Sequence, residues 1–131
     1  MLAYTYMEQG GFELIEKPKL GLKDSRDTIV RVTLSSICTS DLCIKHGSAL
    51  RVVPGITVGH EMVGVVEQVG AEVTSVKFGD RITVNVETFY AGILRLIEKG
   101  EIDTTSLITH RFPLDRIEEA TAFLRTKRME L

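Results

Sequence analysis

The spacing of apolar residues changes its period near Phe89, and this change limits the folds that the chain can adopt. Over residues 1–89, apolar and polar residues tend to alternate, which is typical of strands with one buried face. Over residues 90–131, apolar residues recur every three or four positions, which is typical of helices that bury one face. The sequence therefore predicts a mainly β protein of the α+β class, with a β part followed by a short helical part.

Short strands are expected in the β part, at residues 3–7, 12–15, 27–37, 62–69 and 81–86. In the third of them, Val30, Val32 and Leu34 share one face, which we expect to be half-buried. Gly10 and Gly11 are expected to form the turn between the first two strands, because glycine accepts positive φ.

Glycine residues mark the bends of the β part. Gly64 interrupts a valine-rich strand, which indicates a bulge or a close approach of neighbouring backbone, as at the bend of a small barrel. Turns are expected at Gly70, Gly79 and Asp80.

Two helices are expected after Phe89. The apolar face of the first consists of Tyr90, Ile93, Leu94 and Ile97. Gly100 is expected to end this helix. The second follows Pro113, where Asp115 and Glu118 have the spacing of an N-terminal capping arrangement.

Length and composition exclude several classes of protein. The 131 residues fit a single domain, and 44% hydrophobic with 26% charged residues is an ordinary globular composition, which argues against intrinsic disorder. The formal net charge is −2, and no basic run is present that could neutralise nucleic acid or an anionic bilayer. We therefore expect neither nucleic acid nor a membrane as a partner.

The sequence also bears on the compartment in which the protein works. Residues 1–10 lack the basic and apolar regions of a signal peptide, and no apolar stretch approaches the roughly 18 residues of a membrane helix. A cytoplasmic location is expected. In a reducing compartment, Cys38 and Cys43 are expected to be thiols and not a disulfide.

Side chains that can bind a metal are concentrated in one region. This region contains Cys38, Ser40, Asp41, Cys43 and His46, followed by His60 and Glu61. Thiolate, imidazole and carboxylate together suit Zn²⁺, and a catalytic zinc site uses three protein ligands and one open position. The spacing matches neither a zinc finger nor a zinc ribbon, so the residues alone leave open both a zinc site built by folding and a buried thiol with an ordinary histidine.

These residues resemble the zinc-containing medium-chain alcohol dehydrogenases. Gly59-His60-Glu61, Gly64, Gly70 and Val73 reproduce the family pattern G-H-E-x-x-G-x-x-x-x-x-G-x-x-V. The segment 38–41 (Cys-Thr-Ser-Asp) is similar to the family's first zinc-ligand segment. The segment 77–81 is similar to the family segment that leads into the next strand. The resemblance implies a GroES-like, partly open β-barrel with two short C-terminal helices.

The resemblance also implies a role for each site residue. Cys38 and His60 would be zinc ligands, and Glu61 would be an alternative ligand or an electrostatic neighbour of the metal. Asp41 would hydrogen-bond the second ring nitrogen of His60. Ser40 would face the oxygen of a small alcohol, a secondary alcohol or a polyol, and pass its proton onward.

Three other residues receive weaker assignments. His46 could take part in the proton relay, although an exposed histidine is the favoured interpretation. Cys43 stands where many family members carry a relay histidine and is expected to be a packed thiol. His110 is expected to have a structural role.

Parts of the family pattern have no counterpart in this sequence. No two of the eleven glycines are separated by a single residue, so even the opening G-x-G of a dinucleotide-binding motif is absent. The third zinc ligand and the four-cysteine structural-zinc lobe also lack matching positions. Because residues 90–131 resemble the family's C-terminal return segment, we expect a single domain over residues 1–131 with a deletion junction near 89/90.

Two functions are consistent with this pattern. The first is a catalytic-domain remnant of a zinc-dependent alcohol dehydrogenase, inactive alone, with weak or partial zinc occupancy and with NAD(P) used only by the intact family enzyme. The second is a binding or assembly module that forms a homo-oligomer through the exposed former domain interface.

Overall fold

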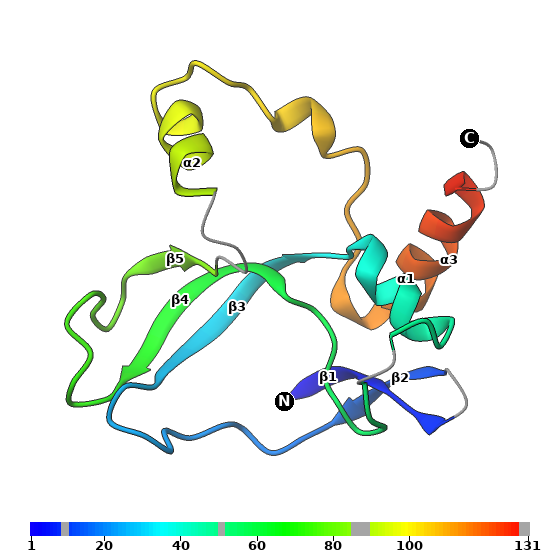
Figure 1. Cartoon of the computed structure of the whole chain (residues 1–131), viewed down its shortest axis with the longest axis horizontal. Helices are drawn as coiled ribbons and strands as arrows, with labels where there is room; N and C mark the ends of the chain where they lie inside the picture. Colours follow the sequence, from blue (N-terminus) through cyan, green and yellow to red (C-terminus); the bar gives the residue numbers. More distant parts are fainter. Residues whose placement is uncertain (9–10, 50–51, 85–89, 129–131) are drawn as a thin grey trace. The chain divides into compact units, whose positions relative to one another are not determined.

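The computed structural model describes residues 1–8, 11–49, 52–84 and 90–128 (Figure 1). The chain divides into two compact units, Met1–Val84 and Asn85–Leu131, and each is described here by itself. The expected deletion junction borders residues 85–89, which lie outside the described residues. Within the described ranges, no helix is long and apolar enough to cross a membrane.

The first unit begins with a β-hairpin. Strand β1 (Leu2–Tyr6) pairs antiparallel with β2 (Phe12–Glu16). Phe12 is 8% exposed, and its ring centroid lies 5.0 Å from that of Tyr4 and 5.9 Å from that of Tyr6. These aromatic contacts bury one side of the hairpin and help to fix its register. Both expected strands are confirmed, whereas the expected turn at Gly10 falls on residues outside the described ranges.

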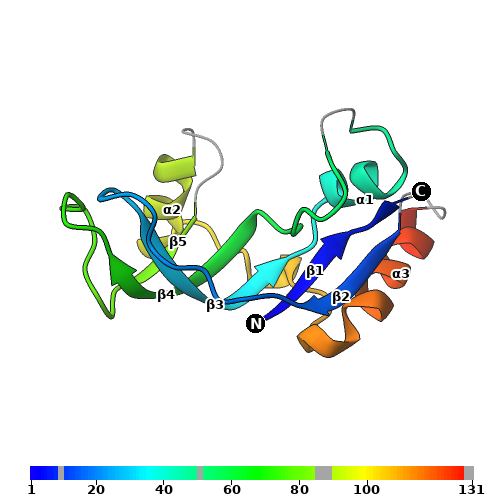
Figure 2. The same cartoon turned by 90° about the horizontal axis from the view of Figure 1, so that it is seen from below.

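The second sheet of this unit has three antiparallel strands. They are β3 (Thr28–Ser36), β4 (Glu61–Val69) and β5 (Arg81–Thr83), with β4 in the middle (Figures 1 and 2). The expected mainly β fold is confirmed. Its sheets are open, one with two strands and one with three, so the described strands do not close into a barrel.

Gly64 lies where β4 leaves no room for a side chain against β3. It pairs with Val32, and the register of the two strands shifts between Val32 and Leu34. A Cβ atom at Gly64 would lie 2.5 Å from the carbonyl oxygen of Arg31 and 2.5 Å from Cγ1 of Val30. The expected bulge and close backbone approach at Gly64 are therefore confirmed.

The structure also overturns one expectation for β3. Val32 and Leu34 are 48% and 52% exposed, so the predicted half-buried face does not extend along the whole strand. Every residue from Arg31 to Ser36 is exposed, so neither face of this stretch of β3 is covered. Alternation in the sequence indicates which side chains share a face, but not whether another element packs on that face.

The second unit is helical, as expected. Helix α2 (Tyr90–Glu98) is followed by 3₁₀ helix η2 (Thr105–Leu107). Gly100 has a φ of +72°, and its N–H donates to the carbonyl of Ile97, so this glycine ends the helix in the left-handed conformation that glycine favours.

The start of the last helix differs from the prediction. Helix α3 (Ile117–Arg128) continues directly from 3₁₀ helix η3 (Leu114–Arg116). Asp115 therefore lies inside a helical turn and is not the N-cap of α3, so the predicted capping arrangement with Glu118 is wrong. Instead, both guanidinium nitrogens Nε and Nη2 of Arg116 donate to the Glu119 carboxylate, at 2.8 and 2.5 Å.

Candidate metal centre

The paired ends of β3 and β4 bring two segments of the chain together. The last pair of the ladder joins Ser36 to Glu61, the residue that begins β4. Beyond Ser36 the chain reaches Cys38, which precedes helix α1 (Thr39–Lys45). His60 stands directly before Glu61, so antiparallel pairing places the cysteine beside the histidine and the glutamate although they are distant in sequence.

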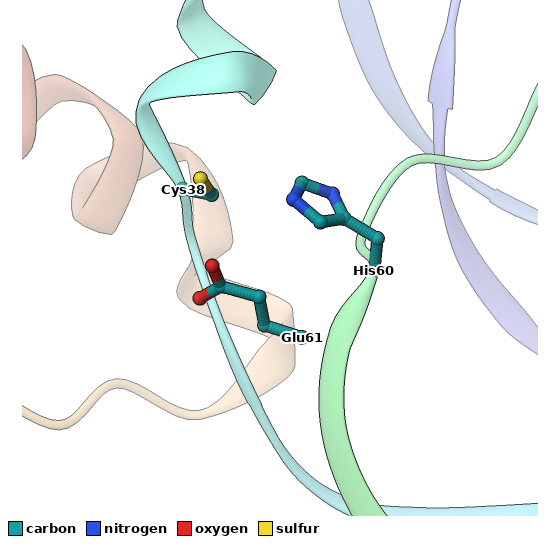
Figure 3. Close-up of side chains that lie close together, drawn as sticks. All are labelled: Cys38, His60 and Glu61. Atoms are coloured by element: carbon teal, nitrogen blue, oxygen red, sulfur yellow. The ribbon is translucent and has the colours of Figure 1, made fainter. Parts of the chain in front are cut away.

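Cys38, His60 and Glu61 form one cluster. The Cys38 thiol sulfur, a ring nitrogen of His60 and a carboxylate oxygen of Glu61 all lie within 4.8 Å of one another (Figure 3). Each of the three residues is half-buried. In a tetrahedral zinc site with bonds of roughly 2.0–2.3 Å, neighbouring ligand atoms are about 3.3–3.8 Å apart. Small side-chain rotations would therefore close these three donors around an ion, and the donor set fits zinc.

Asp41 connects two of the cluster residues. Its side chain is 8% exposed, and Oδ2 accepts a hydrogen bond of 2.8 Å from the backbone N–H of Cys38. Its other oxygen, Oδ1, lies 3.9 Å from Nδ1 of His60, which is beyond hydrogen-bond distance, and has no other partner in the described structure. A buried carboxylate oxygen without a partner is costly, and an approach of about 1 Å by the imidazole N–H would satisfy it. The position of Asp41 therefore fits a metal-bound His60 whose second nitrogen is held by a carboxylate.

Ser40 contacts the opposite side of the same imidazole. Its Oγ lies 3.2 Å from Nε2 of His60, and the serine is exposed in the first turn of α1. The structure thus places the predicted relay hydroxyl directly beside a predicted ligand.

The remaining predicted residues lie outside the cluster. Cys43 is a half-buried free thiol within α1, and His46 is exposed at the C-terminal end of that helix. His110 belongs to the second unit, where its ring lies tilted against Phe123 at a centroid distance of 4.1 Å and nearly parallel to Phe112 at 6.4 Å.

Two features of the site were not foreseen from the sequence. One is the hydrogen bond from the Cys38 N–H to Asp41, and the other is the contact between Ser40 and His60. The first has a recognisable signal, because an acidic residue three positions after a helix N-cap commonly accepts the N-cap N–H. The second contact depends on how the paired strands bring His60 to α1. The sequence separation of Ser40 and His60 therefore gives no signal of it.

The fold and the cluster agree with comparisons to known proteins. Residues 24–107, which are more than half of the chain, match the alcohol dehydrogenase GroES-like domain, and the chain belongs to this family. The resemblance drawn from the sequence is therefore confirmed. The matched range continues past the expected junction near Phe89 and Tyr90.

Individual relatives support the same assignment. The chain is 37% identical over 84 residues to the "Uncharacterized zinc-type alcohol dehydrogenase-like protein AdhB" of Bacillus subtilis, covering 64% of this chain and 22% of that protein. It is 39% identical over 82 residues to an alcohol dehydrogenase of Cupriavidus necator, covering 63% of this chain and 22% of that protein. The solved apo form of zinc-dependent alcohol dehydrogenase 2 from Streptococcus pneumonia superposes with a TM-score of 0.63 at 30% identity, covering 71% of this chain and 28% of that one. The chain thus spans about a quarter of the length of these proteins.

Proposed function

We propose that this chain carries the metal-binding part of the active site of a zinc-dependent alcohol dehydrogenase. The observation that supports this most directly is the convergence of Cys38, His60 and Glu61, whose donor atoms lie within 4.8 Å of one another. The intact enzymes of this family oxidise alcohols with NAD(P) as the hydride acceptor. When bound, zinc would supply a Lewis acid that stabilises the alkoxide form of the alcohol.

The residues of this chain would have separate tasks at that site. Cys38 would bind as thiolate, His60 through Nε2 and Glu61 through its carboxylate. Asp41 would keep the proton of His60 on Nδ1, so that the other nitrogen remains a ligand. The exposed hydroxyl of Ser40 would hydrogen-bond the alcohol, accept its proton and release its own hydroxyl proton onward in the same step.

Proton release completes this assignment. After Ser40, the proton would reach water near His46. This histidine is exposed at the C-terminal end of α1. Cys43 receives no role in metal binding.

The hydride acceptor has no recognisable place in these 131 residues. The sequence contains no G-x-G, and dinucleotide binding at a glycine-rich turn requires that motif. We therefore propose that the chain alone does not oxidise alcohols with NAD(P), and that the family's cofactor-binding segment is deleted near 89/90. With Glu61 in place of the family's third ligand, we expect the zinc affinity to be weaker than that of a complete family site.

Two assays on the purified chain test this proposal together. Elemental analysis should find zinc in the wild-type chain and in a Cys43→Ala variant, but not in Cys38→Ala. An NAD(P)-dependent alcohol oxidation assay should give no turnover in any of them. Zinc that persists in Cys38→Ala would refute the assigned site, whereas turnover by the wild-type chain would refute the assignment as an incomplete enzyme.

A second candidate function is self-assembly. The exposure of Val32 and Leu34 on β3 favours it, because apolar side chains on one strand that remain accessible can be buried by a second copy of the chain. In this proposal the chain pairs with itself through this surface.

A further inference from the structure

Side-chain hydroxyls hold the start of β4 from both neighbouring strands. They donate to the backbone carbonyls of the first three residues of the strand, which are Glu61, Met62 and Val63. The donors are, in the same order, the hydroxyls of Ser35, Thr83 and Thr33, at 2.8, 3.2 and 3.2 Å. Two of these hydroxyls come from β3 and one from β5, so the end of β4 that carries the proposed ligands is tied to the sheet on both edges.

The two hydroxyls of β3 lie where the pairing of the strands is irregular. The register with β4 shifts between Val32 and Leu34, and Thr33 between them has no partner in the ladder. The extra residue of a bulge is normally left unpaired. Here the hydroxyls of Thr33 and Ser35 cross to β4 and bond its carbonyls at this position.

His60 lies between two points at which the backbone is anchored. On one side, the N–H of Val58 donates to a carbonyl of β1 at 2.9 Å. On the other side, the Glu61 carbonyl accepts the hydrogen bond from Ser35. Gly59, the remaining residue between the anchors, has a φ of +106°, and a Cβ atom built on it would lie 3.9 Å from Oγ of Ser35. The Ser35 hydroxyl is therefore close to the residues on both sides of His60.

We propose that Ser35 is a positioning residue that holds His60 and Glu61 opposite Cys38, with Thr33 in a supporting role. The inference rests on the proposed function of this cluster and adds the residue that preorganises it. The side chains of His60 and Glu61 reach toward Cys38 from the start of β4 (Figure 3), so a shift of this backbone moves both donors together. Donors kept near their bound positions lose less conformational freedom when an ion binds, which strengthens binding.

The inference predicts weaker zinc binding when the Ser35 hydroxyl is removed. The value of one hydrogen bond corresponds to an affinity about two- to tenfold weaker in Ser35→Ala. Zinc affinity is measured on the full chain by competition with a chromophoric chelator, at a temperature where circular dichroism shows each variant to be folded. Ser35→Thr keeps a hydroxyl at this position and should return the affinity to that of the wild type. A merely structural role for Ser35 would lower the Tm and leave the zinc affinity of the folded chain unchanged.

Ser36→Ala is the matched control. Ser36 is the next residue of β3 and is exposed like Ser35, but in the described part of the chain its side chain makes no hydrogen bond. Ser36→Ala should therefore bind zinc as the wild type does, although this residue is closer to Cys38 in the sequence.

Two further variants place the effect along β4. Thr33→Val removes the bond to Val63, two residues beyond the ligand, and should weaken zinc binding by less than Ser35→Ala does. Thr83→Val should bind zinc within about twofold of the wild type. The carbonyl that it leaves, that of Met62, still accepts the N–H of Val84 at 3.0 Å.

The outcomes separate this inference from the function on which it rests. Unchanged zinc affinity in Ser35→Ala, or a loss that Ser35→Thr does not restore, overturns the inference while the metal site stands. If Ser35→Ala does not fold, unchanged affinity in Thr33→Val overturns it in the same way. If the wild type itself binds no zinc, the proposed metal site is refuted and the inference falls with it.

Discussion

Replacing Gly64 by alanine should destabilise the protein, because the structure leaves no room for a methyl group. The new Cβ would lie 2.5 Å from the Arg31 carbonyl oxygen, whereas an ordinary contact needs at least about 3.4 Å. The oxygen belongs to the backbone of β3, so it yields only if the two strands separate. Overpacking of this kind costs about 1–3 kcal/mol, and a backbone obstacle places Gly64→Ala near the upper end.

The net loss of folding stability in Gly64→Ala is smaller than the cost of the strain alone. Alanine restricts the unfolded chain more than glycine does, which stabilises the variant by about 0.4–1 kcal/mol. A net destabilisation of about 2 kcal/mol remains, which lowers the Tm of a unit of this size by on the order of 10 °C. Since β4 begins at Glu61, separation of β3 from β4 should also weaken zinc binding.

Gly21→Ala provides the matched control. A Cβ at Gly21 meets nothing within 4 Å, so this variant should be as stable as the wild type or slightly more stable. Thermal and urea unfolding, followed by circular dichroism, compare the two variants. If Gly64→Ala proves as stable as Gly21→Ala, the close approach of β3 and β4 at Gly64 is not present in the folded protein.

Three further results are expected. Asp41→Asn should weaken zinc binding about 10- to 100-fold in chelator competition, because the carboxylate beside His60 is lost, and an unchanged affinity would contradict its positioning role. The hydrogen bond from Arg116 holds the pKa of Glu119 below its ordinary value of 4.5, so the stabilisation by this pair is present at neutral pH and is lost as the pH falls through that lowered pKa. In Arg116→Gln, the helical circular dichroism signal should depend less on pH in this acidic range, and an unchanged pH profile would argue against the pair. Sedimentation should show self-association, and a strict monomer at high concentration would count against the second candidate function.

The strands could be predicted from the sequence because their signal is local. The alternation of apolar and polar residues located β3 to within one residue at each end, and the valine-rich run located β4. Gly64 was correctly identified as a point of close backbone approach. The exposure of Val32 and Leu34 could not be predicted, because it depends on whether another element packs on β3, and the alternation of residues along one strand does not reveal that. Similarly, Asp115 has the right spacing for a cap, but the chain was already helical at Leu114.

The residues of the candidate metal site could be predicted from the sequence, whereas their arrangement in space could not. Ligand chemistry and the family resemblance selected Cys38, His60 and Glu61 from the sequence. Their convergence depends on the pairing of Ser36 with Glu61, which joins segments that are far apart in the chain. The spacing of the ligands alone therefore could not distinguish a metal site from an inert thiol and an isolated histidine.

The central claim is that Cys38, His60 and Glu61 hold one metal ion, and X-ray absorption at the zinc edge tests it most directly. The chain is loaded with one equivalent of Zn²⁺. The account predicts one sulfur neighbour at about 2.3 Å together with nitrogen and oxygen neighbours at about 2.0–2.2 Å. A zinc ion surrounded only by nitrogen and oxygen, or by two sulfur atoms, would contradict the account.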